Sequence, residues 1–172
     1  MTKIIGIDPG LASTGVAVVQ GTGTRIDGYS FGSINTSTHR SLPERLNHIY
    51  SKLLAVLNND FPDLMVVEDV FSLDRFPTSG ITLGKVSGVI LLAGCQVKVP
   101  VIEVPVREAK KVLTGSGNAT KMQLEKSVRH HLSATTPIRP YHAADAMALA
   151  LIGLFRFDHP LCRRPACTGG RS

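Results

Sequence analysis

The sequence has few cysteines and no long uncharged apolar run. It contains 3 cysteines in 172 residues, and a domain of this length buries on the order of 70% of the surface of its unfolded chain, so it needs no disulfide framework. The longest uncharged apolar stretch, about residues 86–97, is shorter than the roughly 20 residues of a membrane-spanning helix. Asp8 stands where a secretory signal needs its apolar centre. These absences predict a cytoplasmic protein without a transmembrane segment.

The cysteines also give little support for a structural zinc site. Cys162 and Cys167 lie in a tail rich in proline, arginine and glycine, and this pair lacks the two further ligands that such an ion requires. Cys95 stands in an apolar run and is predicted to be a small core residue.

Acidic residues are outnumbered by basic ones. The chain has 13 Asp and Glu against 19 Lys and Arg, which gives a formal net charge of +6. This balance favours a polyanionic partner such as nucleic acid, although many basic proteins bind none. With 43% hydrophobic and 19% charged residues, the composition is that of a globular chain rather than a disordered one.

The apolar pattern predicts an α/β fold with a mixed sheet of about five strands flanked by helices. Three short β-type runs come first and suit an antiparallel meander, and two buried strands follow among helices. The expected strands cover residues 3–8, 15–20, 25–34, 64–71 and 99–104, and the expected helices cover about residues 42–57, 79–96, 107–113, 121–132 and 140–157. Residues 1–157 are expected to form one domain, and residues 158–172 a flexible tail.

The expected helix over residues 79–96 is apolar nearly all round. It carries Gly84 and Gly88, four residues apart. Such a helix is predicted to be buried on more than one side, either in the core or against a second subunit, where small residues let another backbone approach closely.

Three acidic residues stand where apolar residues are expected. Asp8 ends an apolar strand, and Glu68 lies near the end of a strand that is apolar on both faces. Asp145 continues the apolar stripe of the last helix, with His142 three residues earlier on the same face. Taken singly, each acid fits a turn or a structurally paired charge, but an unpaired buried carboxylate is costly.

The topology predicts that these side chains meet. In an open α/β sheet, functional groups gather at the carboxyl ends of the strands. Oxygen ligands with one nitrogen suit Mg²⁺ or Mn²⁺ better than structural zinc. Two such ions, about 3.5–4 Å apart, can activate a water molecule and stabilise the leaving oxygen of a phosphodiester. The pattern therefore predicts a metal-dependent nuclease.

Five motifs in order resemble those of the RuvC Holliday-junction resolvases. They are Gly6-Ile-Asp-Pro-Gly10 with Thr14-Gly15, Glu68-x-Val-Phe71, Leu83-Gly84-x-x-x-Gly88, Gly115-x-Gly-x-Ala-x-Lys-x-Gln123 and His142-Ala-Ala-Asp-Ala146, and they span most of residues 3–152. The resemblance implies an RNase H-like fold, a homodimer, and metal-dependent cleavage of four-way DNA junctions by paired symmetric nicks that leave 5′-phosphate and 3′-hydroxyl ends. A branch-migration complex of the RuvAB type is an implied further partner.

The resemblance also implies roles for individual residues. Up to two Mg²⁺ ions per subunit are expected, with Mn²⁺ as a substitute, and Lys121 is expected to assist catalysis. The implied metal-binding and catalytic residues are Asp8, Glu68, His142 and Asp145. The expected DNA-binding residues are Phe71, Lys85, Lys110, Lys111, Lys121 and Arg129, although on spacing alone Lys110 and Lys121 fit solvated helix faces and Phe71 fits the core.

Two residues depart from the family pattern. His142 stands where many members have a second aspartate, which removes one negative charge from the cluster and favours Mn²⁺. Asp69 follows Glu68 where glutamine is common, and strand alternation points it to the opposite face. Residues 72–79 do not match the expected pattern, so the cleavage sequence preference stays open.

Three alternative functions fit parts of the sequence. An actin-like ATPase shares the first motif but needs a second similar domain, for which 172 residues are too few. An RNase H-like RNA-processing nuclease would use similar acids but would not need the apolar helix with its glycines. A junction-binding protein with a decayed site would account for His142, but Asp8, Glu68 and Asp145 argue against it.

Overall fold

The fold is a five-stranded mixed sheet with helices on both faces. The computed structural model describes residues 1–69 and 77–157, so the predictions for Phe71, for most of residues 72–79 and for the tail 158–172 lie outside the described residues. The elements are β1 (Thr2–Asp8), β2 (Ser13–Thr22), β3 (Arg25–Asn35), α1 (Leu42–Asp60), β4 (Leu64–Glu68), α2 (Pro77–Gln96), β5 (Val101–Val104), α3 (Val106–Thr114), α4 (Lys121–His131) and α5 (Tyr141–Arg156). The predicted α/β class is confirmed.

The sheet brings the carboxyl ends of three strands to one edge. Its order is β3-β2-β1-β4-β5, with the first three strands forming the predicted antiparallel meander. Strands β4 and β5 run parallel to β1. Asp8 pairs with Gly15 across β1 and β2, and Glu68 pairs with Val104 across β4 and β5. The edge that carries Asp8 therefore also carries Glu68.

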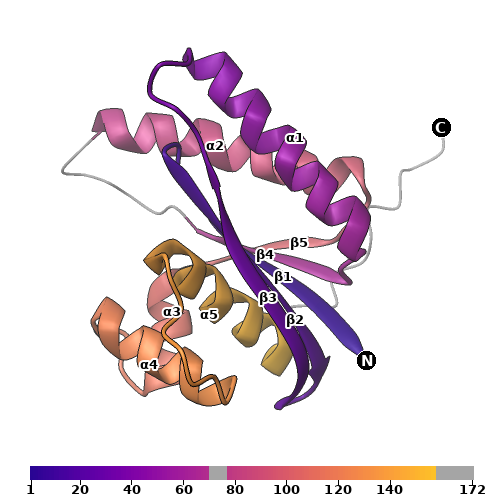
Figure 1. The fold of residues 1–172 in the computed structure, drawn as a ribbon, viewed down its shortest axis with the longest axis vertical. Helices are drawn as coiled ribbons and strands as arrows, with labels where there is room; N and C mark the ends of the chain where they lie inside the picture. Colours follow the sequence, from indigo (N-terminus) through magenta and orange to yellow (C-terminus); the bar gives the residue numbers. More distant parts are fainter. Residues whose placement is uncertain (70–76, 158–172) are drawn as a thin grey trace, which may run out of the picture.

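The two faces of the sheet bury different side chains from the same strands. Helices α1 and α2 cover one face, and α3, α4 and α5 cover the other (Figure 1). Ile5 and Met65 belong to the core under α1 and α2, whereas Ile4 and Val66 belong to the core under α5. This alternation explains why β1 and β4 are apolar at successive positions.

Helix α5 lies directly against the sheet because two glycines leave room for it. Residues 143–154 of α5 are all buried. A Cβ atom on Gly6 would collide with the backbone of Ala146, and one on Gly15 would collide with the carbonyl group of His142. Only glycine allows the helix backbone to come this close to β1 and β2.

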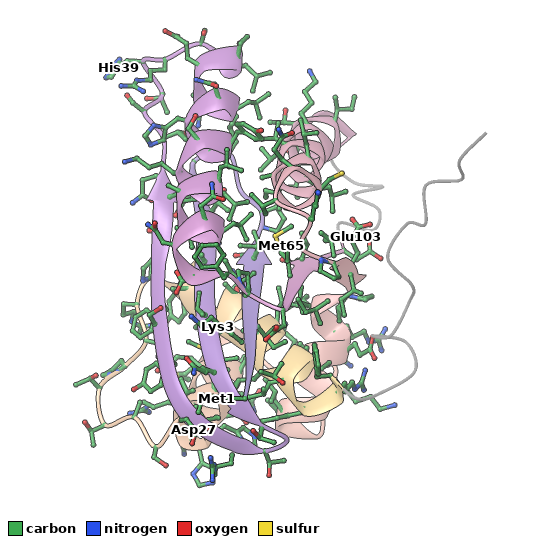
Figure 2. All side chains as sticks on the ribbon, turned by 90° about the vertical axis from the view of Figure 1, so that its right-hand side faces the viewer. Met1, Lys3, Asp27, His39, Met65 and Glu103 are labelled. Atoms are coloured by element: carbon green, nitrogen blue, oxygen red, sulfur yellow. The ribbon has the colours of Figure 1, made fainter. Side chains whose placement is uncertain are left out.

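Helix α2 packs on the opposite face and leaves one side uncovered. Figure 2 shows it beside α1, with Met65 in the layer beneath. Val86, Ile90 and Ala93 are buried. On the outer side, Ile81 is 63% exposed and Leu92 is 55% exposed.

The exposed side of α2 corrects two predictions. A Cβ atom on Gly84 or Gly88 would meet no other atom within 4 Å, so of the two expected locations the core of the same chain is wrong, and burial against a second subunit stays a prediction. Cys95 is exposed, so its assignment to the core is also wrong. Its position in the last turn of α2, on the side away from the sheet, is the physical reason.

By length and composition alone, α2 is also able to cross a membrane. The window Ser79–Gln96 meets that criterion, and 28% of its residues are buried. The core helix of a soluble protein passes the same test. No transmembrane segment was expected because only uncharged apolar stretches were considered. The window Ser79–Gln96 is longer because it also includes the charged residue Lys85.

Candidate active site

Asp8 stands at the end of β1, beneath the first turn of α5. It is 6% exposed, and its Oδ2 atom lies 2.6 Å from Nδ1 of His142. The pairing of Asp8 with Gly15 explains this contact, because the missing side chain of Gly15 lets the backbone of His142 approach the sheet. The short strand-to-strand turn is held by Thr14, whose hydroxyl donates to the Gly10 carbonyl at 2.8 Å.

Glu68 ends the parallel strand β4 and interacts with Asp8. Burial, together with a hydrogen bond with Asp8 in which the shared proton stays on Glu68, raises the pKa of Glu68 from 4.5 to about 8. Burial also raises the pKa of Asp8, from 3.8 to about 6, although accepting the proton of Glu68 opposes this. Without a bound divalent cation, this pair of carboxyl groups resists losing both protons, although the positive charge of Lys121 lowers both pKa values.

Asp145 lies in the first half of α5 and faces a lysine from α4. It is 8% exposed, and its Oδ2 atom lies 3.8 Å from Nζ of Lys121. Burial raises the pKa of Asp145, and the positive charge of Lys121 opposes this rise. Lys110, on α3, lies near enough to lower the pKa values of Asp145 and Glu68. Several elements thus supply charged groups to one sheet edge.

The Asp, Glu and His side chains of this site are of the type that binds hard divalent cations, although they do not form a complete coordination site. Within residues 1–69 and 77–157, no group of three or more His, Cys, Asp or Glu side chains is placed to hold one ion. Asp8 bonds to His142, and Asp145 pairs with Lys121. Three carboxyl groups with raised pKa values nevertheless lie in one partly buried site, and such oxygen donors are those that Mg²⁺ and Mn²⁺ prefer.

The other residues predicted to bind DNA lie on several helices, and these helices cover both faces of the sheet. Lys110 and Lys111 are on α3, and Lys85 is exposed on α2, which covers the opposite face of the sheet. Arg129 forms an ion pair with Glu125, with Nε and Oε1 3.5 Å apart. None of these placements tests DNA binding, so the roles stay predictions.

Glu125 is a supporting residue that the sequence reasoning missed. It is 6% exposed and accepts a hydrogen bond from the backbone N–H of Ile138 at 3.0 Å. This bond ties α4, which begins at Lys121, to the segment that leads into α5. An acid between the apolar residues Leu124 and Val128 was the available signal.

A second missed feature is the role of Gly6 and Gly15. Both belong to motifs that carry the family resemblance, but the motifs alone do not explain why glycine is needed at these positions. The available signal was a glycine inside an apolar strand, which often marks a close approach of another backbone. Both glycines let α5 deliver His142 and Asp145 to Asp8.

Comparison with known proteins identifies the family. The sequence profile of "Crossover junction endodeoxyribonuclease RuvC" matches residues 4–153. The chain belongs to the RuvC family. A RuvC protein of Rhodopirellula baltica is 38% identical over 158 residues, which cover 92% of this chain and 89% of that protein. A RuvC protein of Carboxydothermus hydrogenoformans is 36% identical over 154 residues, covering 90% and 96% of the two chains. The chain is therefore a crossover junction endodeoxyribonuclease by family.

Solved RuvC structures share the fold over nearly the whole chain. Thermus thermophilus RuvC, in complex with a Holliday junction substrate, is 31% identical and superposes with a TM-score of 0.84, covering 90% of this chain and 94% of that one. The yeast mitochondrial Holliday junction resolvase Ydc2, at 11% identity and a TM-score of 0.60, shares the fold alone. The predicted RNase H-like architecture is confirmed.

Proposed function

We propose that the chain resolves four-way DNA junctions by paired, symmetric, metal-dependent nicks that leave 5′-phosphate and 3′-hydroxyl ends. The observation that carries this proposal is the RuvC family match over residues 4–153. The same residues hold Asp8, Glu68 and Asp145 together at one sheet edge.

Asp8, Glu68, Asp145 and His142 would hold up to two Mg²⁺ ions, with Mn²⁺ as a substitute. One ion would be bound by Asp8 and Asp145 with His142, and the other by Asp8 and Glu68. Divalent ions bound there supply activation of a water molecule and neutralisation of the leaving oxygen. The raised pKa values of Asp8 and Glu68 support this assignment, because a nearby cation favours the ionised carboxylates that metal binding requires.

Lys121 would act on the phosphate. Its Nζ atom is 3.8 Å from Asp145, and its side chain is 62% exposed, so it can reach a bound anion without leaving the site. The capping interaction of Thr120 with Gln123, in which the Gln123 N–H donates to Thr120 Oγ1 at 3.2 Å, fixes the first turn of α4. A cation there would stabilise the negative charge that develops during cleavage.

A second copy of the chain is the proposed cover for the exposed side of α2. This side carries Ile81, Gly84, Gly88 and Leu92, and burying it would remove apolar surface from water. A two-fold dimer through α2 would supply one site for each of two matching strands. The proposed symmetric nicks require such a pair of sites, and an interaction with a RuvAB-type complex stays a prediction.

The proposal is tested with a synthetic four-way junction and a linear duplex of the same sequence. With Mg²⁺ or Mn²⁺, we expect symmetric nicks in the junction only, and their loss with Asp8→Asn. Junction binding without cleavage by the wild type would indicate a decayed site instead. Equal cleavage of an RNA-containing duplex would favour the RNA-processing alternative.

A further inference from the structure

Glu125 is a buried acidic residue that the proposed cleavage does not use. It lies on α4, one helical turn after Lys121. Its Oε1 atom accepts a hydrogen bond from the backbone N–H of Ile138 at 3.0 Å and lies 3.5 Å from Nε of Arg129. An apolar residue at this position would avoid the cost of burying a charge, so these contacts point to a role beyond packing.

Helix α4 is held in place at fewer points than α5, which lies beside it (Figure 1). Residues 143–154 of α5 are all buried, whereas α4 buries three of its 11 residues. At the end of α4, the ring of His131 packs on Phe155 of α5, with ring centroids 5.4 Å apart. The side chains of residues 121–123, at the start of α4, are exposed. The start of α4 therefore depends most on individual polar contacts.

The contact between Lys121 and Asp145 is too weak to fix the start of α4. Nζ and Oδ2 are 3.8 Å apart, and most of the Lys121 side chain is exposed. Such a pair contributes little, because water screens the charges and the long side chain loses freedom. The bond between Glu125 and Ile138 is buried, and breaking it would leave a buried backbone N–H without a partner. This bond therefore fixes α4 more strongly than the ion pair does.

Ile138 connects the bond of Glu125 to the start of α5. It is buried in the core under α5 and lies two residues before Pro140, after which the helix begins. Fixing Glu125 to this segment also fixes the first turn of α4, because Glu125 and Lys121 are one turn apart on the same helix. The distance from Lys121 to α5 thus depends on Glu125.

We propose that Glu125 is a positioning residue that holds Lys121 beside Asp145 through its hydrogen bond to Ile138. The inference rests on the proposed cleavage, in which Lys121 acts on the phosphate. Glu125 itself contacts neither DNA nor metal in this role. The position of Lys121 matters because a misplacement of about 1 Å lowers a reaction rate by up to about a hundredfold.

Two substitutions in the full-length chain separate the length of the Glu125 side chain from its charge. Glu125→Gln removes the charge but keeps an oxygen that accepts from Ile138. Glu125→Asp keeps the charge, but its carboxyl group falls about 1.5 Å short, the length of one C–C bond. Single-turnover cleavage of a four-way junction, with saturating protein and Mn²⁺, should slow about tenfold for Glu125→Asp and stay within about threefold of the wild type for Glu125→Gln. Junction affinity in EDTA should not fall in either variant.

Ser127→Ala is the matched control for general loosening of α4. The Ser127 hydroxyl donates to the Leu113 carbonyl on α3, so this variant loses a contact of the same helix that does not involve α5. It should lower the free energy of unfolding in urea and leave the cleavage rate unchanged. Equal losses of rate in Ser127→Ala and Glu125→Asp, or a slower rate for Glu125→Gln than for Glu125→Asp, would overturn the positioning role.

A second test asks whether Glu125 acts through Lys121. In the Lys121→Ala background, Glu125→Asp should cause no further loss of rate, because the group that it positions is already absent. Losses that multiply would show that Glu125 acts independently of Lys121 and would also overturn the proposal.

A readout without DNA separates this inference from the proposed cleavage. The NMR signals of the Lys121 Cε protons, assigned by their loss in Lys121→Arg, should move in Glu125→Asp toward their positions in Asp145→Asn. They should stay in place in Glu125→Gln. If these signals behave as expected but the wild type does not cut the junction, only the cleavage proposal is wrong. If the wild type cuts and the signals are the same in all Glu125 variants, only the positioning role is wrong.

Discussion

Helices α5 and α2 are both apolar and both contain glycine or alanine at close spacing, yet they bury different amounts of themselves. Residues 143–154 of α5 are all buried, whereas Ile81 and Leu92 of α2 are more than half exposed. Hydrophobicity alone does not distinguish the two helices. The two helices differ in whether the surface beneath them has glycines that let the helix backbone come close to it.

The glycines show this difference directly. Gly6 and Gly15 are on the strands beneath α5, and a side chain on either would strike the helix backbone. Gly84 and Gly88 are on α2 itself and face open space. Small residues on the sheet therefore let α5 pack closely within one chain, whereas small residues on α2 leave an exposed surface, which we propose a second chain covers.

The sharpest contrast between the two helices is in activity. Asp145→Asn on α5 should lower junction cleavage by about a thousandfold, because weakened metal binding costs several kcal/mol of transition-state stabilisation. Gln96→Ala, at the exposed end of α2, should leave the rate unchanged. Single-turnover cleavage with saturating Mn²⁺ measures both. A retained rate in Asp145→Asn would remove α5 from the active site.

The contrast in packing should appear in stability. Gly15→Ala should lower the free energy of unfolding by about 3 kcal/mol, because the added methyl group forces α5 off the sheet. Gly88→Ala should leave it unchanged or raise it by up to about 1 kcal/mol, because alanine favours the helix. Urea unfolding at low protein concentration makes the comparison. Similar losses for the two variants would mean that α2 is also packed through its glycines.

The acids under α5 should make the metal-free protein sensitive to pH. The pKa values of Asp8 and Glu68 are about 6 and 8 in the folded protein, against ordinary values of 3.8 and 4.5. The folded chain therefore holds protons that the unfolded chain has released, and its stability falls as pH rises from about 4 to 8. We expect a loss of several kcal/mol between pH 5 and 8 in EDTA.

The control for this titration is Glu68→Gln, which should flatten the pH dependence. Added Mg²⁺ or Mn²⁺ should reverse the loss at pH 8, because the ions bind the ionised carboxylates of the folded state only. Thermal unfolding with and without metal at each pH measures this. A metal-free stability that rises between pH 5 and 8 would contradict the buried, protonated pair.

The smallest effect concerns the exposed side of α2. Leu92→Lys should weaken self-association about tenfold, because it places a charge in the proposed apolar contact. Asn58→Lys, on the exposed surface of α1, should not. Sedimentation equilibrium gives both dissociation constants. Equal constants for the two variants would place the dimer contact elsewhere.

Much of the fold was predictable because apolar periodicity reports which faces of an element are buried. The expected strands and helices are found, although β4 ends at Glu68 and β5 begins at Val101. The position of Cys95 was not predictable, because an apolar run does not say which residues of a helix face the sheet. Acids in apolar strands also marked the site before any coordinates, since only function or pairing explains them.

The order of motifs along the chain, the acids among apolar residues and the excess of basic side chains determined the family and the kind of chemistry. Only the tertiary structure decided that Gly15 lets His142 reach Asp8, that Lys121 meets Asp145, and that Arg107 and Lys111 line one cavity beside α5. Local sequence encodes periodicity and charge. Distances between segments far apart in the chain depend on packing, which any single segment leaves undetermined.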